Sequence, residues 1–175
     1  MSSLGDVIHA LPAVTDAARH GIHFDWVVEE GFAEIARAHP AVQRVIPIAW
    51  RRWRGQLGSS LPQLREFLSS LRADRYDAII DSQGLIKSSV VSLLARGSRH
   101  GFSHTSAREP WAAFTYGNRI RIARRQHAID RQRQLFAEAF GYQLSDNMAS
   151  GLEQRGPRDN RVILLHGTTW ESKHY

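Results

Sequence analysis

The residue whose type and position best suit it to do chemistry is Asp6, in the opening segment SSLGD. A carboxylate on a loop that follows a strand can act as a general base when it lies within hydrogen-bonding distance of the proton it removes. Gly5 would let the backbone turn tightly beside it. An acidic residue in the first turn of a helix is also common, because the positive end of the helix dipole favours it. The segment alone is compatible with both interpretations.

A second segment, HGTTWESK at residues 166–173, is typical of phosphate binding. Thr168 and Thr169 offer hydroxyls and backbone N–H groups, and Lys173 offers a point charge. The sequence contains neither G-x-x-x-x-G-K-[ST] nor G-x-G-x-x-G, so it carries no Walker loop and no dinucleotide fingerprint. The nine histidines show no metal-ligand spacing, and we predict no metal site.

Arginines supply the third group of candidates, beginning with WRRWR at residues 50–54. The guanidinium forks of Arg51 and Arg54 suit anions, and the interleaved tryptophans offer flat faces to a ring or to nucleic-acid bases. A solvated surface loop is the simpler interpretation. Arg108 and Arg131 are separate candidates for anion contacts. The run RIRIARR at residues 119–125 is most typical of a solvated, weakly amphipathic segment.

Alternating strands and helices must position these segments. Strands are predicted at residues 24–28, 42–49, 78–81, near 100–102, and at 161–165; helices are predicted at 6–18, 32–38, 61–72, 85–95 and 127–140. Pro12 is expected to kink the first helix or to mark a fresh first turn. Residues 50–60 read as a loop, and residues 104–126 as irregular. The alternation predicts an α/β fold with a parallel sheet, whose carboxyl edge collects SSLGD, DSQG (residues 81–84) and HGTTWESK.

Composition narrows the class of protein without choosing a substrate. The 175 residues carry a net charge of +6, nearly all of it from arginine, which favours an anionic partner. There is no cysteine, no apolar run long enough to cross a bilayer, and no signal-peptide pattern, which together fit a cytoplasmic protein. We expect one domain at residues 1–150, a linker at 151–160, and the start of a second domain at 161–175.

Five segments in order resemble the lipopolysaccharide heptosyltransferase family (glycosyltransferase family 9), type I in particular: SSLGDVIHALPA, DSQGLIKSS, SAREPWAAFTY, HAIDRQR and LLHGTTWESKHY. The resemblance implies a GT-B architecture of two Rossmann-like domains. It implies an inverting transfer of heptose from ADP-heptose to Kdo of the lipopolysaccharide inner core, with Asp6 as catalytic base and no cofactor or metal. It also implies a Kdo-lipid A acceptor and a location on the cytoplasmic face of the inner membrane of a Gram-negative bacterium, bound peripherally.

The resemblance also assigns binding residues. The acceptor-binding set is Ser3, Arg51, Arg54, Gln83, Lys87, Arg108 and Arg131, and the donor-phosphate set is Thr168, Thr169 and Lys173. Family members carry an apolar strand before SSLGD and a full donor domain after the linker. We therefore expect this chain to be a fragment that lacks its first strand and most of the second domain, with an open apolar slot beside the neighbouring strands.

Three alternatives to this function stay open. The first is another enzyme of the same family with a different acceptor. The second is a basic, non-enzymatic module that binds nucleic acid through WRRWR and RIRIARR, with a steep dependence on salt. The third is a remnant that does not fold stably.

Overall fold

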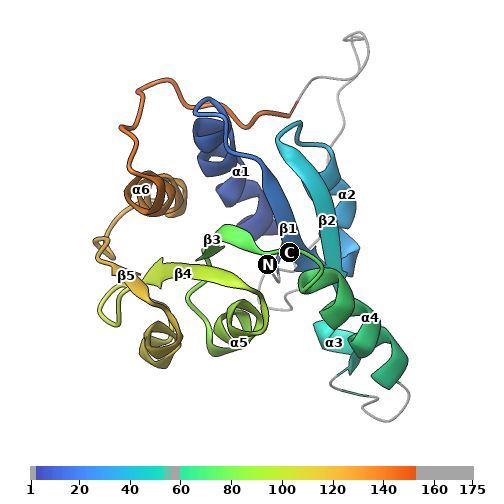
Figure 1. Cartoon of the computed structure of the whole chain (residues 1–175). Coiled ribbons are helices and arrows are strands. Elements are labelled where there is room, and N and C mark those ends of the chain that lie inside the picture. Colours follow the sequence, from blue (N-terminus) through green and yellow to red (C-terminus); the bar gives the residue numbers. More distant parts are fainter. Residues whose placement is uncertain (1–2, 54, 56–59, 153–175) are drawn as a thin grey trace, which may run out of the picture.

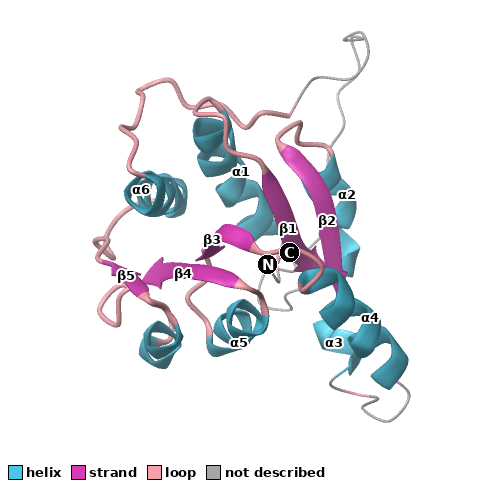
Figure 2. Cartoon of the chain, in the orientation of Figure 1, coloured by secondary structure: helices cyan, strands magenta, loops and turns pink. Residues whose placement is uncertain are grey.

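The computed structural model describes residues 3–53, 55 and 60–152, which form an α/β fold of helices and short parallel strands (Figures 1 and 2). The helices are α1 (Leu4–Ala18), α2 (Ala33–Arg37), α3 (Trp50–Trp53), α4 (Leu61–Leu71), α5 (Ile86–Leu94) and α6 (Ala128–Phe140), with 3₁₀ turns η1 (Glu30–Phe32) and η2 (Pro110–Thr115). The strands are β1 (Phe24–Glu29), β2 (Val42–Ile48), β3 (Tyr76–Asp81), β4 (Gly97–Phe102) and β5 (Asn118–Ile120).

The strands form two parallel sheets with a cavity between them. β1 pairs with β2, and β3, β4 and β5 pair in that order, all parallel. A cavity of about 670 Å³ is lined by residues of both β1 and β3, including Trp26 and Val27 on one side and Ile79 and Ile80 on the other. The expectation of an open, largely apolar slot beside these strands is therefore confirmed.

Helices cover both faces of the sheets, as the alternating elements predict. One cluster packs α1 and α6 against residues such as Trp26, Val28 and Phe102. The other packs Phe67 and Leu71 of α4 against β2 and the end of α5. In Figure 1, α1 and α6 lie above the β3–β5 sheet, while α5 and the unlabelled η2 lie below it. The parallel strands thus direct their carboxyl ends, and the loops that follow them, to one edge.

Two sequence expectations about local structure were wrong. Residues 50–53 form the short helix α3 instead of a loop, and β5 lies inside the stretch expected to be irregular. Pro12 lies within α1, which runs unbroken from Leu4 to Ala18, so no fresh first turn begins there, and the expected kink stays a prediction. Burial of Leu11, Pro12 and Ala13 in the core helps to offset the hydrogen bond that proline cannot make.

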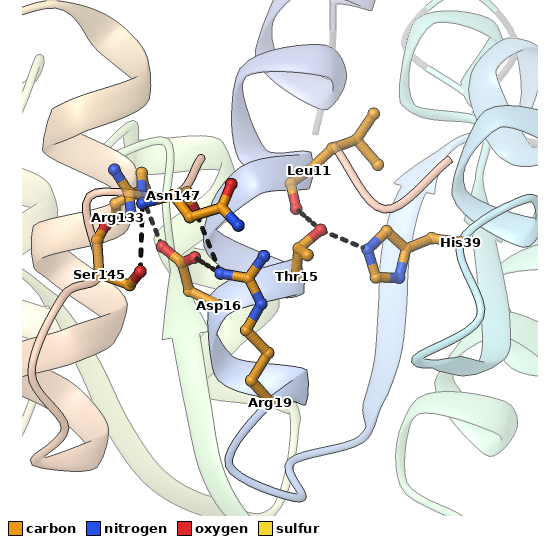
Figure 3. A network of polar contacts seen from close by, with 8 residues as sticks. All are labelled: Leu11, Thr15, Asp16, Arg19, His39, Arg133, Ser145 and Asn147. Atoms are coloured by element: carbon orange, nitrogen blue, oxygen red, sulfur yellow. Dashed lines mark hydrogen bonds and ion pairs between the residues drawn. The ribbon is translucent and has the colours of Figure 1, made fainter. Parts of the chain in front are cut away.

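A buried ion pair fastens α1 to α6 (Figure 3). Nε of Arg133 lies 2.5 Å from Oδ2 of Asp16, and both side chains are largely buried. Arg19 contacts the other oxygen of the same carboxylate. Through backbone oxygens of Ser145 and Asn147, these two arginines also hold the segment that follows α6. The carboxylate is thus compensated on both sides, as a buried charge requires.

Candidate functional site

Asp6 lies in the first turn of α1, held there by the residue that caps the helix. Ser3 is the N-cap, and its Oγ accepts a hydrogen bond from the backbone N–H of Asp6 at 3.2 Å. The expected tight turn at Gly5 is wrong, because Gly5 is helical and has no positive φ. A methyl group at Gly5 would meet nothing within 4 Å. The helix therefore begins earlier than expected and carries the carboxylate at its positive end.

Two further side chains, from distant segments, converge on the Asp6 carboxylate. Nε2 of Gln83 donates to Oδ2 at 2.9 Å, and Nη2 of Arg108 donates to Oδ1 at 2.9 Å. These residues are 77 and 102 positions away along the chain. Four of the residues predicted for the site, Ser3, Asp6, Gln83 and Arg108, therefore meet at the same edge of the fold.

The pKa of Asp6 is lowered from its usual value by this environment. Burial acts in the opposite direction and is the largest influence, but the side chain of Ser3, the charge of Arg108 and the hydrogen bonds from Arg108 and Gln83 together outweigh it. The carboxylate is accordingly ionised at neutral pH. It is only 11% exposed, while the Arg108 side chain is 51% exposed and reaches it from the solvent side.

Asp81, at the end of β3, shapes the loop that carries Gln83. Oδ1 of Asp81 accepts the backbone N–H groups of Gln83 at 2.9 Å and Gly84 at 3.3 Å, and Oδ2 accepts the hydroxyls of Ser88 at 2.8 Å and Tyr116 at 2.6 Å. Asp81 is 5% exposed, so these donors are what keep its charge satisfied. Burial, followed by the Asp81 charge, raises the pKa of Tyr116 well above its usual range.

The loop that carries Arg108 is tied down along its backbone. Arg131 donates to the carbonyl of Ser106 at 2.5 Å, and Arg124 donates to the carbonyl of Ala107. At Gly84, whose φ is +62, an added Cβ would lie only 3.2 Å from Cα of Ala107, so the two loops pack closely and the left-handed backbone favours glycine. This support explains how Arg108 is directed onto Asp6.

The sequence pattern did not identify Arg124, because residues 119–125 are typical of a solvated, weakly amphipathic segment. The same run also contributes Ile122, which is 5% exposed and packs in the core, and whose N–H donates to Ser106 Oγ at 2.9 Å. The signal available in the sequence was the apolar alternation of Ile120 and Ile122, which indicates a strand edge.

Arg131 lies deeper than Arg108 and is incompletely satisfied within the described residues. Its guanidinium lies 4.8 Å from the centre of the Phe102 ring. Its Nε is buried and has no hydrogen-bond partner in the part of the chain that the structure describes. Burial, and then the charges of Arg108 and Arg124, lower the pKa of Arg131. The three arginines form a local concentration of positive charge that an anion would relieve.

The remaining predicted acceptor residues are spread more widely. Lys87 lies in the first turn of α5, lines the cavity between β1 and β3, and makes no hydrogen bond or ion pair among the described residues. Arg51 lies on α3. Arg54 and the three donor-phosphate candidates, Thr168, Thr169 and Lys173, lie outside the described residues.

One of the two tryptophans predicted to offer a flat face is not available for stacking. Trp53 is 9% exposed, packs edge-on against Phe67 at 5.6 Å between ring centres, and donates from Nε1 to Gln63 at 3.2 Å. Trp50 is partly buried beside it and lines the cavity between β1 and β3. The nucleic-acid alternative therefore loses the Trp53 ring as a stacking surface.

Residues 3–53, 55 and 60–152 contain neither a cluster of metal-ligating side chains nor a membrane-spanning helix. No group of three or more histidine, cysteine or acidic side chains is placed there to hold a metal ion. None of the helices in the same ranges is both long and apolar enough to cross a membrane.

Comparison with protein families matches residues 64–175 to glycosyltransferase family 9 (heptosyltransferase). The chain is 48% identical over 185 residues to lipopolysaccharide heptosyltransferase 1 of Pseudomonas aeruginosa, covering 99% of this chain and 52% of the relative. It is 46% identical over 186 residues to lipopolysaccharide heptosyltransferase 1 of Escherichia coli K12, covering 99% of this chain and 58% of the relative. The chain thus spans about half the length of the curated relatives it matches.

Solved structures give the same result. E. coli heptosyltransferase WaaC with ADP matches with a TM-score of 0.95 and 44% identity, covering 99% of this chain and 58% of that one. WaaC with ADP-2-deoxy-2-fluoro heptose matches with a TM-score of 0.82 and 48% identity, covering 85% of this chain and 49% of that one. The expected α/β fold class is therefore confirmed.

Proposed function

We propose, since the chain belongs to glycosyltransferase family 9, the heptosyltransferases, that the protein containing it transfers heptose from ADP-heptose to Kdo of the lipopolysaccharide inner core. The relatives named lipopolysaccharide heptosyltransferase 1 and the WaaC complexes with ADP and a fluoro analogue of ADP-heptose support this donor and this acceptor class. The described residues then form the acceptor side of a two-domain GT-B enzyme.

The observation that carries the proposal is the convergence of two distant segments on the Asp6 carboxylate. Gln83 and Arg108 come from separate parts of the chain and donate to its two oxygens, while Ser3 caps the helix that carries it. An acidic residue in the first turn of a helix needs only its own turn, so that role does not account for the contacts from Gln83 and Arg108. They are what a carboxylate fixed for proton transfer requires.

In this mechanism Asp6 acts as the general base. Its carboxylate takes the proton from a Kdo hydroxyl while that oxygen attacks the anomeric carbon of the heptose from the face opposite the diphosphate. The new C–O bond forms, the bond to ADP breaks, and ADP leaves with the electron pair, so that the configuration at the anomeric carbon inverts. Gln83 keeps the carboxylate in one orientation, because it donates to the oxygen that Arg108 does not contact.

Arg108 couples binding of the acceptor to the basicity of the Asp6 carboxylate. In the ligand-free chain it is half exposed and contacts Asp6 through one nitrogen. An acceptor carboxylate or phosphate competes for that guanidinium, and Arg131 and Arg124 reinforce the attraction. Loss of the Arg108 contact raises the pKa of Asp6 and increases its basicity at the moment when a proton must be removed.

The other assignments follow the family pattern and stay proposals. Arg51, Arg54 and Lys87 join the residues around Asp6 in holding the anionic acceptor, while the donor diphosphate is held by Thr168, Thr169 and Lys173. No metal or cofactor takes part. The enzyme acts at the cytoplasmic face of the inner membrane, where it is bound peripherally to reach a lipid-linked acceptor.

An acceptor competition tests the proposal against the other enzymes of the family. The protein that contains this chain at full length is incubated with ADP-heptose and equal amounts of a Kdo-terminated and a heptose-terminated acceptor, and both products are measured by mass spectrometry. We expect heptose on the Kdo-terminated acceptor. Product on the heptose-terminated acceptor alone would assign a different acceptor, and no product on either would refute the transferase assignment.

A further inference from the structure

Helix α5 exposes three large apolar side chains and buries two serines, although its other large apolar residues, Val91 and Leu94, pack against the core. Ile86, Val90 and Leu93 are 48%, 40% and 46% exposed, and their spacing places them on one face of the helix. Ser89 and Ser92 are buried, with hydroxyls that donate to backbone oxygens of their own helix. A surface helix of a globular protein normally shows the opposite pattern, so this face is adapted to contact something other than water.

The neighbouring turn η2 adds two exposed aromatic rings. Trp111 is 73% exposed and Phe114 is 66% exposed, with ring centres 5.7 Å apart. Between them in sequence, Ala112 and Ala113 are buried and anchor the turn. η2 packs against α5, and the two helices lie side by side below the β3–β5 sheet in Figure 1. We call Ile86, Val90, Leu93, Trp111 and Phe114 the α5–η2 surface.

The chain around this surface is strongly basic. Residues 82–127 contain eight basic residues and one acidic residue, Glu109. The Glu109 carboxylate accepts the backbone N–H of Ile86 at 2.6 Å at the start of α5. The guanidinium of Arg119 lies 5.8 Å from the centre of the Phe114 ring, and Arg121 and Arg125 are also exposed. Positive charge therefore borders the exposed rings.

We propose that the α5–η2 surface docks the protein on an anionic phospholipid membrane. Tryptophan and phenylalanine insert readily at the level of the lipid headgroups, and each arginine near the surface adds attraction to anionic lipid. Neither signal alone gives stable attachment to a bilayer, but the two occur together here. A binding partner with a neutral apolar surface would not use the surrounding arginines.

The position of the α5–η2 surface relates docking to the proposed function, and this step of the inference rests on that function. Arg108 lies three residues before Trp111, and Glu109 joins the Arg108 loop to both Gly84 and the first turn of α5. A membrane that contacts the α5–η2 surface would therefore hold a lipid-linked acceptor close to the residues around Asp6.

Vesicle flotation of this chain tests the docking directly. One set of vesicles contains phosphatidylethanolamine and phosphatidylglycerol at a molar ratio of roughly 3:1, which gives an anionic surface that attracts arginine. The other set contains phosphatidylcholine alone and has no net charge. We expect binding to the first composition and at least about tenfold weaker partitioning when Trp111→Gln and Phe114→Gln are combined. The matched control combines Leu61→Gln and Met148→Gln, which remove exposed apolar side chains elsewhere and should leave partitioning unchanged.

Two further measurements separate the remaining outcomes. Arg119→Gln should weaken partitioning roughly fivefold at low salt and have a smaller effect at high salt. Sedimentation equilibrium shows whether the chain self-associates through the same surface. Absence of binding to anionic vesicles, equal binding by the Trp111/Phe114 variant, or a dimer that this variant dissolves would each overturn the proposal, the last by assigning the surface to a second copy.

A soluble acceptor distinguishes failure of docking from failure of the proposed function. In the full-length protein, Trp111→Gln with Phe114→Gln should leave transfer to a lipid-free Kdo acceptor unchanged and reduce transfer to the same acceptor carried in vesicles. Loss of transfer to both acceptors by this variant would count against docking, because a membrane surface has no part in the lipid-free reaction. Absence of transfer by the unaltered protein would instead count against the proposed function.

Discussion

The contact between Arg108 and Asp6 makes a measurable contribution to the acidity of Asp6. A charge-assisted hydrogen bond at 2.9 Å is worth about 1.5–3 kcal/mol when shielded. The Arg108 side chain is 51% exposed, which reduces the contribution toward the ~0.2–1 kcal/mol of exposed pairs. We therefore take about 1 kcal/mol, which corresponds to roughly 0.7 pH units in the pKa of Asp6.

Arg108→Ala should raise the pKa of Asp6 by that amount, and the direct measurement is the pH dependence of its side-chain ¹³C chemical shift. Because the pKa of Asp6 is lowered in the folded chain, the pair stabilises the fold above the ordinary pKa of aspartate, and this stability is lost as the pH falls through the folded pKa. The free energy of unfolding of the variant should thus be lower by about 1 kcal/mol at neutral pH, with a smaller difference in acid.

Arg52→Ala is the matched control, because Arg52 makes an exposed ion pair with Glu30 that is separate from the residues around Asp6. It should leave the pKa of Asp6 unaltered. An unchanged pKa of Asp6 in Arg108→Ala, or an equal change in Arg52→Ala, would refute the idea that Arg108 sets the strength of this base.

Three further predictions concern the framework that holds the site, each checked by urea unfolding. Tyr116→Phe should lower the free energy of unfolding by about 1.5–3 kcal/mol, because it removes a donor from the buried Asp81 carboxylate. Tyr142→Phe should leave this free energy almost unchanged, because the Tyr142 hydroxyl is buried without a hydrogen-bond partner among the described residues. Equal losses in the two variants would contradict this. Arg133→Met should lower the free energy of unfolding by about 3–5 kcal/mol, because the buried Asp16 carboxylate loses its main partner. A loss of less than about 1 kcal/mol would refute the role of this ion pair. Burial lowers the pKa of His39, whose Nδ1 accepts the N–H of Ala41. The free energy of unfolding should therefore fall as the pH drops below the unfolded pKa of about 6.5, and His39→Gln should flatten this dependence. An equally steep dependence in the variant would exclude His39 as its source.

The sequence predicted the elements of the fold well, because their apolar periods are long and unambiguous. The helices over residues 61–71 and 128–140 and the strand at 24–29 lie within two residues of their expected bounds. The short helix α3 was missed because its four residues are too few to show a period, and burial of Trp53 against Phe67, a tertiary contact, stabilises it.

The site was predicted in part, through motifs instead of geometry. SSLGD and DSQG each fall at the carboxyl edge of the sheets, so Asp6 and Gln83 could be placed near each other from topology alone. That Arg108 contacts Asp6 could not be predicted, because it depends on the long loop after β4 and on its support by Arg124 and Arg131. The exposed apolar face of α5 could not be predicted either, because the sequence pattern alone does not say which apolar side chains of a helix face the solvent.

The assignment of Asp6 as the base is tested most directly by Asp6→Asn in the protein that contains this chain at full length. Asparagine keeps the shape of the side chain but cannot accept the proton. The account predicts that transfer of heptose falls by at least about a hundredfold, as expected when a general base is removed, while ADP-heptose and the Kdo acceptor still bind in calorimetry. Turnover within a few fold of the unaltered enzyme, with both substrates bound, would contradict it and leave Asp6 as an acidic residue that favours the positive end of α1.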